Sequence, residues 1–342
     1  MATHDATVEL LRDGRTWGSF VRDHAMELSG AVALVAALAL FSVLRPDVFP
    51  TSANLSVVLS NTSVAGVLAI GLSVSLVAGQ FDLSIGAVLA ITGVLVAALL
   101  NHGVPWPIAV LGAVALGAGI GLINGVLTVR GEVLSIVATL GMQSVIIGVL
   151  TWTTNDAYIQ ITPRALPDFG RESVLGVPNI ALVMLVLGVA GALAMRYTTA
   201  GRNLQAVGRN PEAARLAGLN VGGYVLASLA VTGAFAGIAG VLLASHLGGG
   251  HPEVGPGYVL PAFAAAFLGA AAHRTGTFTF LGGLYGAFLL TSVTNGLVIA
   301  NAADWTANVI TGLVLLGAVL LSRIARRRTL ARVKRVREES AS

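Results

Sequence analysis

Long apolar runs, separated by short polar breaks, recur along nearly the whole of this 342-residue sequence. A helix that crosses a bilayer needs about 20 predominantly apolar residues. Only helices and closed barrels satisfy their backbone polar groups in lipid, so runs of this length favour helices. The pattern therefore predicts an all-α membrane protein with about ten transmembrane helices. The predicted spans are 28–44, 54–78, 84–101, 106–128, 133–153, 175–195, 224–246, 257–272, 278–299 and 304–322.

Composition excludes a soluble globule. Charged residues make up 11% of the chain and apolar residues 55%, whereas a soluble domain carries about 25% charged residues. The chain also has no Cys, which excludes disulfides, thiolate metal sites and cysteine nucleophiles. We expect neither a cofactor nor a bound metal.

The distribution of Lys and Arg predicts the orientation of the spans. Cytoplasmic loops carry the excess of these residues. With the N-terminus inside and ten spans, 17 of the 20 cations fall inside and only Arg45, Arg164 and Arg171 fall outside. The split predicts that both termini are cytoplasmic, because an odd number of spans would break the alternation.

Three segments follow from this arrangement: a cytoplasmic N-terminal segment (1–27), a transmembrane domain (28–322) and a basic cytoplasmic tail (323–342). The first segment holds five acids and is too long and acidic to begin a cleavable signal peptide. The tail holds eight of the cations and would rest against anionic lipid headgroups. The pI near 10.0 therefore needs no nucleic-acid partner.

Spans 2–5 could recur as spans 7–10 in inverted orientation, as in many transporters. Sliding 86–126 onto 257–297 without a gap, an offset of 171, gives seven identities in 41 positions. About four are expected by chance at this composition, so the alternative is an accidental match between glycine-rich helices.

The loop 197–223 is the longest internal loop and carries the signals of a short helix. Asn210 suits the N-cap, Pro211 the first helical position and Glu212 the first turn, and Gly218 is placed to end the helix. Two turns are too short to be stable alone in water. The helix must therefore pack on a partner protein, or else on its own bundle or on lipid headgroups.

Asp82 is the one acidic residue that approaches the apolar region between spans 2 and 3. Ser84 follows it, and Gly79 and Gly86 flank the pair. One interpretation is a broken or re-entrant turn that lines a pathway, in which Asp82 braces backbone amides. The alternative is a helix cap for span 3 at the cytoplasmic edge.

Neutral polar groups in the spans are further pathway candidates, because amides and hydroxyls can hydrogen-bond a sugar or polyol. For Asn124 and Asn295 the alternative is a hydrogen bond between helices, and for Ser and Thr a bond to their own helix. The candidates are Asn61, Ser63, Asn124, Thr139, Gln143, Ser144, Thr291, Thr294 and Asn295.

The near absence of ionisable residues within the spans argues against proton or sodium coupling, which uses buried acids. The chain also lacks the Gly-x-x-x-x-Gly-Lys-Ser/Thr phosphate loop. This combination favours a transport subunit driven by a separate ATPase. Two alternatives remain, a secondary transporter and an intramembrane enzyme, although no metalloprotease or Gly-x-Ser-x-Gly motif is present.

Three stretches resemble one family. Residues 201–218 (GRNLQAVGRNPEAARLAG) resemble the cytoplasmic signature of the ribose-type sugar permeases of bacterial ABC importers, which are related to branched-chain amino-acid permeases. Residues 78–86 (AGQFDLSIG) resemble the family's Asp-Leu-Ser motif, and residues 121–125 (GLING) with 139–141 (TLG) resemble its fourth and fifth spans. The resemblance covers about residues 50–325.

The resemblance implies a bacterial inner-membrane permease that pairs with a second copy or a sister permease, without catalytic residues of its own. Cytoplasmic ATPase subunits would grip the loop helix, and an extracytoplasmic solute-binding protein would dock outside, where 155–174 is the longest loop. The implied coupling residues are Asn210, Pro211, Glu212, Ala213, Ala214, Arg215 and Gly218, and the candidate translocation path is Asn61, Asp82, Ser84, Asn124, Thr139, Gln143 and Asn295.

One departure affects the substrate. Many ribose permeases have an acidic residue after the Gly-Tyr of span 8, where this chain has Val259 after Tyr258. The resemblance therefore implies a sugar or similar polar solute but does not name it.

The cation distribution generates a topology test. A single cysteine placed at Ser173 should react with a membrane-impermeant thiol reagent added from outside, and one at Thr199 only from inside. The chain has no native Cys, so the introduced cysteine is the only thiol in each variant. Labelling of both positions from one face of the membrane would contradict the ten-span arrangement.

Overall fold

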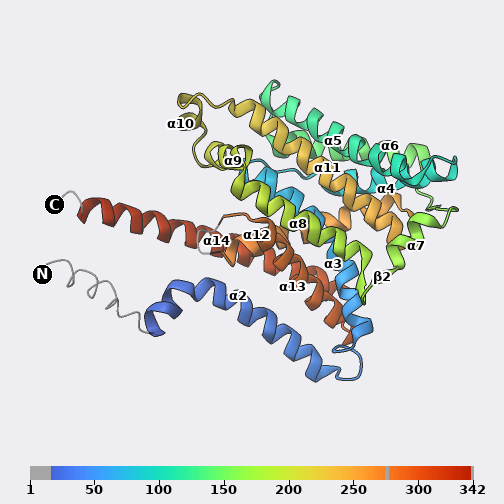
Figure 1. Ribbon diagram of the computed structural model, residues 1–342, viewed down its shortest axis with the longest axis horizontal. Coiled ribbons are helices and arrows are strands. Elements are labelled where there is room, and N and C mark those ends of the chain that lie inside the picture. Colours follow the sequence, from blue (N-terminus) through green and yellow to red (C-terminus); the bar gives the residue numbers. More distant parts are fainter. Residues whose placement is uncertain (1–16, 274–276, 340–342) are drawn as a thin grey trace, which may run out of the picture.

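A computed structural model describes residues 17–273 and 277–339. Long helices dominate it, and the only strands within the described residues are four two-residue segments that pair as β1–β4 and β2–β3 (Figure 1). The elements are α2 (Trp17–Leu44), α3 (Ser52–Val77), α4 (Ile85–Asn101), α5 (Trp106–Val129), α6 (Ser135–Thr154), β1 (Ile159–Gln160), α7 (Ala165–Arg171), β2 (Ser173–Val174), β3 (Val177–Pro178), α8 (Asn179–Tyr197), α9 (Thr199–Arg209), α10 (Pro211–Leu216), α11 (Val221–Leu247), β4 (Gly249–Gly250), the 3-10 helix η1 (Pro252–Val254), α12 (Pro256–Ala271), α13 (Phe280–Ile299) and α14 (Asp304–Glu339).

Each predicted span contains one long helix, with three differences at the ends. The helix of the sixth predicted span, α8, starts at Asn179 rather than at 175. Residues 173–178 instead form the hairpin β2–β3, which turns at Leu175 and Gly176, both at positive φ. The helix α2 extends back to Trp17, into the predicted N-terminal segment, and α14 extends through the predicted tail to Glu339. Residues 1–16 and 340–342 of those two segments lie outside the described residues.

Eight helices in the described part of the chain are long and apolar enough to cross a membrane. Two predicted spans are shorter: the apolar part of α2 (Gly30–Leu44) and α4 (Ile85–Asn101). The 17 residues of α4 rise about 25 Å, less than the hydrocarbon thickness of about 30 Å. The all-α membrane fold is confirmed.

The two helices at the centre of the bundle are α3 and α11, which contact each other and most of the other long helices. Leu68, Ile70 and Leu72 of α3 and Leu229 of α11 are completely or almost completely buried. The outer helices instead expose large apolar side chains, such as Val186 of α8 and Leu316 of α14. Proteins in water rarely expose so many large apolar side chains, so this surface is suited to contact with lipid.

The helices after α2 fall into two sets with the same spacing. The starts of α3, α4, α5 and α6 precede those of α11, α12, α13 and α14 by 169, 171, 174 and 169 residues. Contacts are matched as well. The pairs α3–α13, α4–α5 and α4–α6 correspond to α11–α5, α12–α13 and α12–α14, and all six are present.

Glycines bring α5 and α11 into backbone contact. A Cβ at Gly117 would collide with the carbonyl oxygen of Gly233, and a Cβ at Gly233 would collide with that of Gly117. One turn further along, Gly121 meets the carbonyl of Leu229 in the same way. Small residues at such crossings allow the close packing on which membrane helices depend.

The helices α4 and α12 both begin inside the bundle. Their first turns cross at Gly86 and Gly255, where a Cβ on either residue would collide with the carbonyl oxygen of the other. Segments without α-helix lead into both helices. They are residues 79–84 before α4 and residues 248–255 before α12, the latter including β4 and the 3-10 helix η1. Two interrupted helices therefore meet near the middle of the bundle.

The two ends of the bundle differ. The helices α9 and α10, the described start of α2 and the described end of α14 lie toward the left in Figure 1, whereas α7 and β2 lie toward the right. The end of α5 lies with the first group, because Gly222 at the start of α11 contacts Val129.

The α5–α11 contact generates a stability test. Gly117→Ala should destabilise the folded protein by about 1–3 kcal/mol, because the added methyl group forces two backbones apart. Gly119→Ala is the matched control, since no atom lies within 4 Å of a Cβ at Gly119 on the same helix. Thermal unfolding in detergent should show a lower melting temperature for Gly117→Ala only. Equal melting temperatures would contradict the close contact.

Candidate functional site

Residues 79–84 interrupt the helical bundle between α3 and α4. Gly79 ends α3 in the left-handed conformation, with φ +78°, and the Gln80 amide donates to the carbonyl of Ser75 at 2.8 Å. This pairing is the Schellman arrangement, which favours glycine because a side chain is strained at positive φ. The chain then continues without helical hydrogen bonds until Ile85.

Side chains from α6 bind the backbone of this segment. The amide of Phe81 donates to Ser135 Oγ at 3.2 Å, and the amide of Leu83 donates to Thr139 Oγ1 at 3.1 Å. The Thr139 hydroxyl in turn donates to the Ser135 carbonyl at 2.8 Å. Two amides that would otherwise be unpaired within the bundle are thus satisfied by hydroxyl groups.

Asp82 braces the start of α4. Its Oδ1 accepts hydrogen bonds from the Ser84 amide at 2.9 Å and from the Ser84 hydroxyl at 2.6 Å. Asn124 of α5 donates to the Ser84 hydroxyl at 3.0 Å. All three residues are at most 1% exposed. Asp82 is therefore not the N-cap residue of α4. Ser84 holds that position, and the Ser84 side chain accepts no capping hydrogen bond from the helix.

Two acceptor atoms of this cluster have no protein partner among the described residues. They are Asp82 Oδ2 and Asn124 Oδ1, and both are buried. Buried polar atoms are nearly always hydrogen-bonded, so each one left over needs a physical reason. Each of these two oxygens can accept a hydrogen bond from a water molecule or from a hydroxyl group of a solute.

The structure brings together four of the seven predicted path residues: Asp82, Ser84, Asn124 and Thr139. It does not add the other three to the cluster. Asn295 of α13 donates to Asn54 Oδ1 of α3 at 2.8 Å, a hydrogen bond between helices. Asn61 is exposed on α3, and Gln143 is half-buried one turn after Thr139 on α6.

Sequence reasoning missed Ser135 and Asn54. Ser135 is the first residue of α6, where a serine is usually interpreted as a cap, and its contact with Phe81 spans 54 positions. Its spacing of four from Thr139 was the available signal, because residues four apart lie on one face of a helix.

A cleft of about 250 Å³ lies elsewhere, between α2, α3 and α13. Apolar side chains such as Leu38, Phe49 and Phe288 line it together with polar ones such as Ser42 and Asn54. None of the Asp82 cluster lines it. Its place at the edge of the bundle makes it a poor candidate for a transport path.

The loop helix predicted from 210–218 is present as α10, from Pro211 to Leu216. Asn210 Oδ1 accepts from the Ala213 amide at 3.0 Å, and Glu212 lies in the first turn. Gly218 has φ +84°, so the chain turns there as expected. Ala214 faces the protein, whereas Pro211, Glu212, Ala213 and Arg215 are exposed.

Two features of this loop were not foreseen. Leu216 is 91% exposed at the end of α10. The preceding residues form a second helix, α9, which buries Leu204 and Val207. A Cβ at Gly208 of α9 would collide with the carbonyl oxygen of Val77, the last residue of α3. The loop therefore rests directly on the backbone that leads into residues 79–84.

Known proteins resemble this chain over most of its length. Residues 54–319 match the family described as the permease component of the branched-chain amino acid transport system. The chain belongs to this family. The ribose import permease protein RbsC of Escherichia coli strain K12 is 33% identical over 306 residues, which cover 88% of this chain and 95% of that relative. The autoinducer 2 import system permease protein LsrC of Enterobacter sp. strain 638 is 32% identical over 295 residues, 86% of each chain. No solved structure matches.

The protein is thus a multi-pass membrane permease, the transport subunit of an ABC-type import system rather than an enzyme. The resemblance to permeases predicted from the sequence is confirmed. The roles of the individual path and coupling residues stay predictions.

The hydrogen bonds to residues 79–84 generate a test. Thr139→Val keeps the shape of the side chain but leaves the Leu83 amide without its acceptor, which should cost about 1–3 kcal/mol of stability. Thr153→Val is the matched control, because Thr153 lies on the same helix, is exposed and bonds only its own helix. Thermal unfolding of both purified variants measures the difference. Equal stabilities would show that Thr139 does not hold the segment.

Proposed function

We propose that this permease moves a sugar or a similar small polar solute into the cell by alternating access, driven by a separate ATPase subunit. The observation that carries this proposal is the position of α10. Its exposed face ends in Leu216, which is 91% exposed. An apolar side chain that is so fully exposed on a capped helix is suited to bind in a groove of a partner protein. The helix is also connected to the interrupted α3–α4 segment.

The connection runs through α9. A movement of α10 would reach α9, which α10 contacts, and then Val77 through the backbone contact at Gly208. Val77 lies two residues before Gly79, where the segment that Asp82 braces begins. Because packed backbones transmit displacement without slack, ATP-driven closure at α10 would shift the start of α4.

The solute is proposed from the relatives and from the polar groups of the cluster. Two of the relatives are named as a ribose import permease and an autoinducer 2 import permease. The Ser84 hydroxyl bonds Asp82, the Asn124 amide bonds the Ser84 hydroxyl, and the Thr139 hydroxyl binds the Leu83 amide next to them. Such groups bind hydroxyl-rich solutes better than charged or apolar ones.

Two inverted repeats, α3–α6 and α11–α14, form the core of the proposed mechanism. Their matched spacing and matched helix contacts support the repeat. In such transporters the solute site lies where interrupted helices of the two repeats meet. The crossing of α4 and α12 at Gly86 and Gly255 is the corresponding place here.

We further propose ten crossings with both termini in the cytoplasm, with 28–322 as the permease domain and 197–223 as its coupling loop. The described start of α2 and end of α14 lie at the same end of the bundle as α10 (Figure 1). The exposed Trp106, Trp152 and Trp305 lie at helix ends that this orientation places outside. Tryptophan favours the membrane interface.

The proposed partners are a second permease copy or a sister permease, ATPase subunits on α10, and a solute-binding protein on the opposite end. Residues 155–178 form a surface there from β1, α7 and the hairpin β2–β3. Leu175 at the hairpin turn is 99% exposed. A binding protein that docks on this surface would deliver the solute.

The coupling proposal is tested by the double variant Glu212→Arg, Ala213→Trp. We expect loss of ATPase co-purification and of solute-stimulated ATP hydrolysis in proteoliposomes, because both changes disrupt the exposed face of α10. Insertion into the membrane should be unchanged.

Glu132→Arg is the control, a charge reversal at an exposed loop residue at the same end of the bundle. It should retain normal coupling. Wild-type coupling in the double variant would contradict the assignment of α10, and transport without any ATPase would favour a secondary transporter.

A further inference from the structure

Residues 248–255 connect the end of α11 to the start of α12. Gly248 ends α11 with φ +79°, and β4 then pairs with β1, with Gly250 opposite Ile159 and Gly249 opposite Gln160. The 3-10 helix η1 follows and carries Glu253. This segment is the counterpart, in the other repeat, of residues 79–84.

Close backbone contacts fix the depth of this segment. A Cβ at Gly250 would lie 2.6 Å from the Cα of Val94, in the middle of α4, and Gly255 meets Gly86 at the start of α4. With a rise of 1.5 Å per residue, these levels lie about 10 and 22 Å from the Asn101 end of α4. Asn101 itself bonds the outer loop, at Gln160 and Thr162. Glu253 lies between the two levels.

Glu253 is exposed despite this depth. An ionised carboxylate that faces hydrocarbon is costly, so charged residues at membrane depth face a water-filled cavity or the interior of the assembly. The neighbours of η1 are α4, α6 and α12. The same α6 carries the hydroxyls that bind residues 79–84. Glu253 therefore lies beside the proposed path rather than on the lipid face.

The repeat places Glu253 opposite Asp82. The offset of 171 that separates the starts of α4 and α12 relates Asp82 to Glu253, and Leu83 to Val254. Both acids precede an interrupted helix by the same distance. Their environments differ, because Asp82 is buried against Ser84, whereas Glu253 is exposed.

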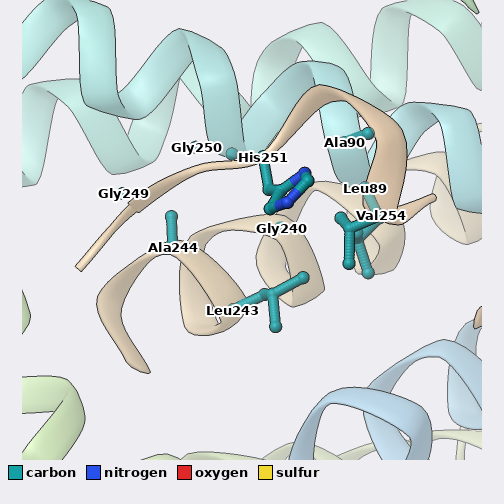
Figure 2. Close-up of a pocket in the computed structure, with 10 residues that line it drawn as sticks. Leu89, Ala90, Gly240, Leu243, Ala244, Gly249, Gly250, His251 and Val254 are labelled. Carbon is teal, nitrogen blue, oxygen red and sulfur yellow. The ribbon is translucent and has the colours of Figure 1, made fainter. Parts of the chain in front are cut away.

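The backbone next to Glu253 is held firmly. His251 and Val254 line a cavity of about 10 Å³ with Leu89 of α4 and Gly240 of α11, and Figure 2 shows the His251 ring among these residues. Such a volume holds at most about one water molecule. The Tyr158 ring meets the His251 ring edge to face, at 6.1 Å. A carboxylate on so fixed a support can act as a selective group.

We propose that Glu253 lines the solute path from the outer side, accepts hydrogen bonds from the hydroxyl groups of a neutral polyol, and opposes anionic solutes. This inference rests on the proposed transport function and adds a residue that selects among solutes by their charge. A carboxylate is an acceptor only, so it matches hydroxyl donors and repels carboxylate or phosphate groups.

Thiol accessibility tests the position of Glu253 without knowledge of the solute. In cells that carry the complete import system, Glu253→Cys should react with the water-soluble cation MTSET added from outside. Val186→Cys is the control, since Val186 is 66% exposed on the apolar surface of α8 and should stay unreactive. A Glu253→Cys chain that inserts but does not react, while Ser173→Cys does, would overturn the proposal.

A second arm measures the charge. The rates of the cation MTSET and the anion MTSES are compared at His251→Cys, alone and combined with Glu253→Gln. For a carboxylate about 8 Å from the thiol, the ratio should fall about fivefold when the charge is removed. Glu172→Gln, at an exposed residue of the outer loop, should leave it unchanged. An unchanged ratio in Glu253→Gln would overturn the selective role.

Neither arm depends on ATP or on the solute. A failure of the proposed function would appear as wild-type coupling in the α10 double variant, whereas a failure of this inference would appear only in thiol reactivity or in the reagent ratio. The two outcomes are therefore distinguishable.

Discussion

Two helices of this permease begin inside the bundle, and the backbone that leads into each must find hydrogen-bond partners within the protein. Lipid offers none, so an interrupted helix survives only where side chains or other strands replace the helical bonds. On one side Ser135 and Thr139 bind the amides of residues 79–84. On the other, β1 pairs with β4. Glycines at the crossing of α4 and α12 then allow the two backbones to touch.

The two interrupted segments join the centre of the bundle to its two ends. Residues 79–84 follow Val77, on which α9 and the proposed ATPase contact rest. Residues 248–255 pair with β1, part of the proposed docking surface for a solute-binding protein. An event at either end thus has a short mechanical route to the start of α4 or α12. Alternating access needs such a pair of routes, because the path must open to one side while it closes to the other.

Asp82 and Glu253 occupy equivalent positions in the two proposed repeats, and their surroundings differ. The first carboxylate is enclosed by hydrogen bonds from Ser84 and holds the start of a helix. The second is exposed at the corresponding place in the other proposed repeat, where the proposed role is contact with the solute. Burial decides the difference, because Asp82 is 1% exposed and bonds Ser84 through Oδ1, whereas the Glu253 side chain is exposed.

The sequence by itself determined the membrane fold, the positions of the long helices and the caps of α10. These features depend on local composition and on spacing within one element, which apolar runs, Asn210 and Gly218 reveal directly. Only the tertiary structure decided which polar residues meet. Thr139 and Asn124 join Asp82, Asn295 pairs with Asn54 instead, and Ser135 enters unforeseen. It also placed Gly208 on Val77 and set Glu253 deep beside α4. Such contacts join residues dozens to hundreds of positions apart, and a periodicity read along one helix carries no information about the helix that packs against it.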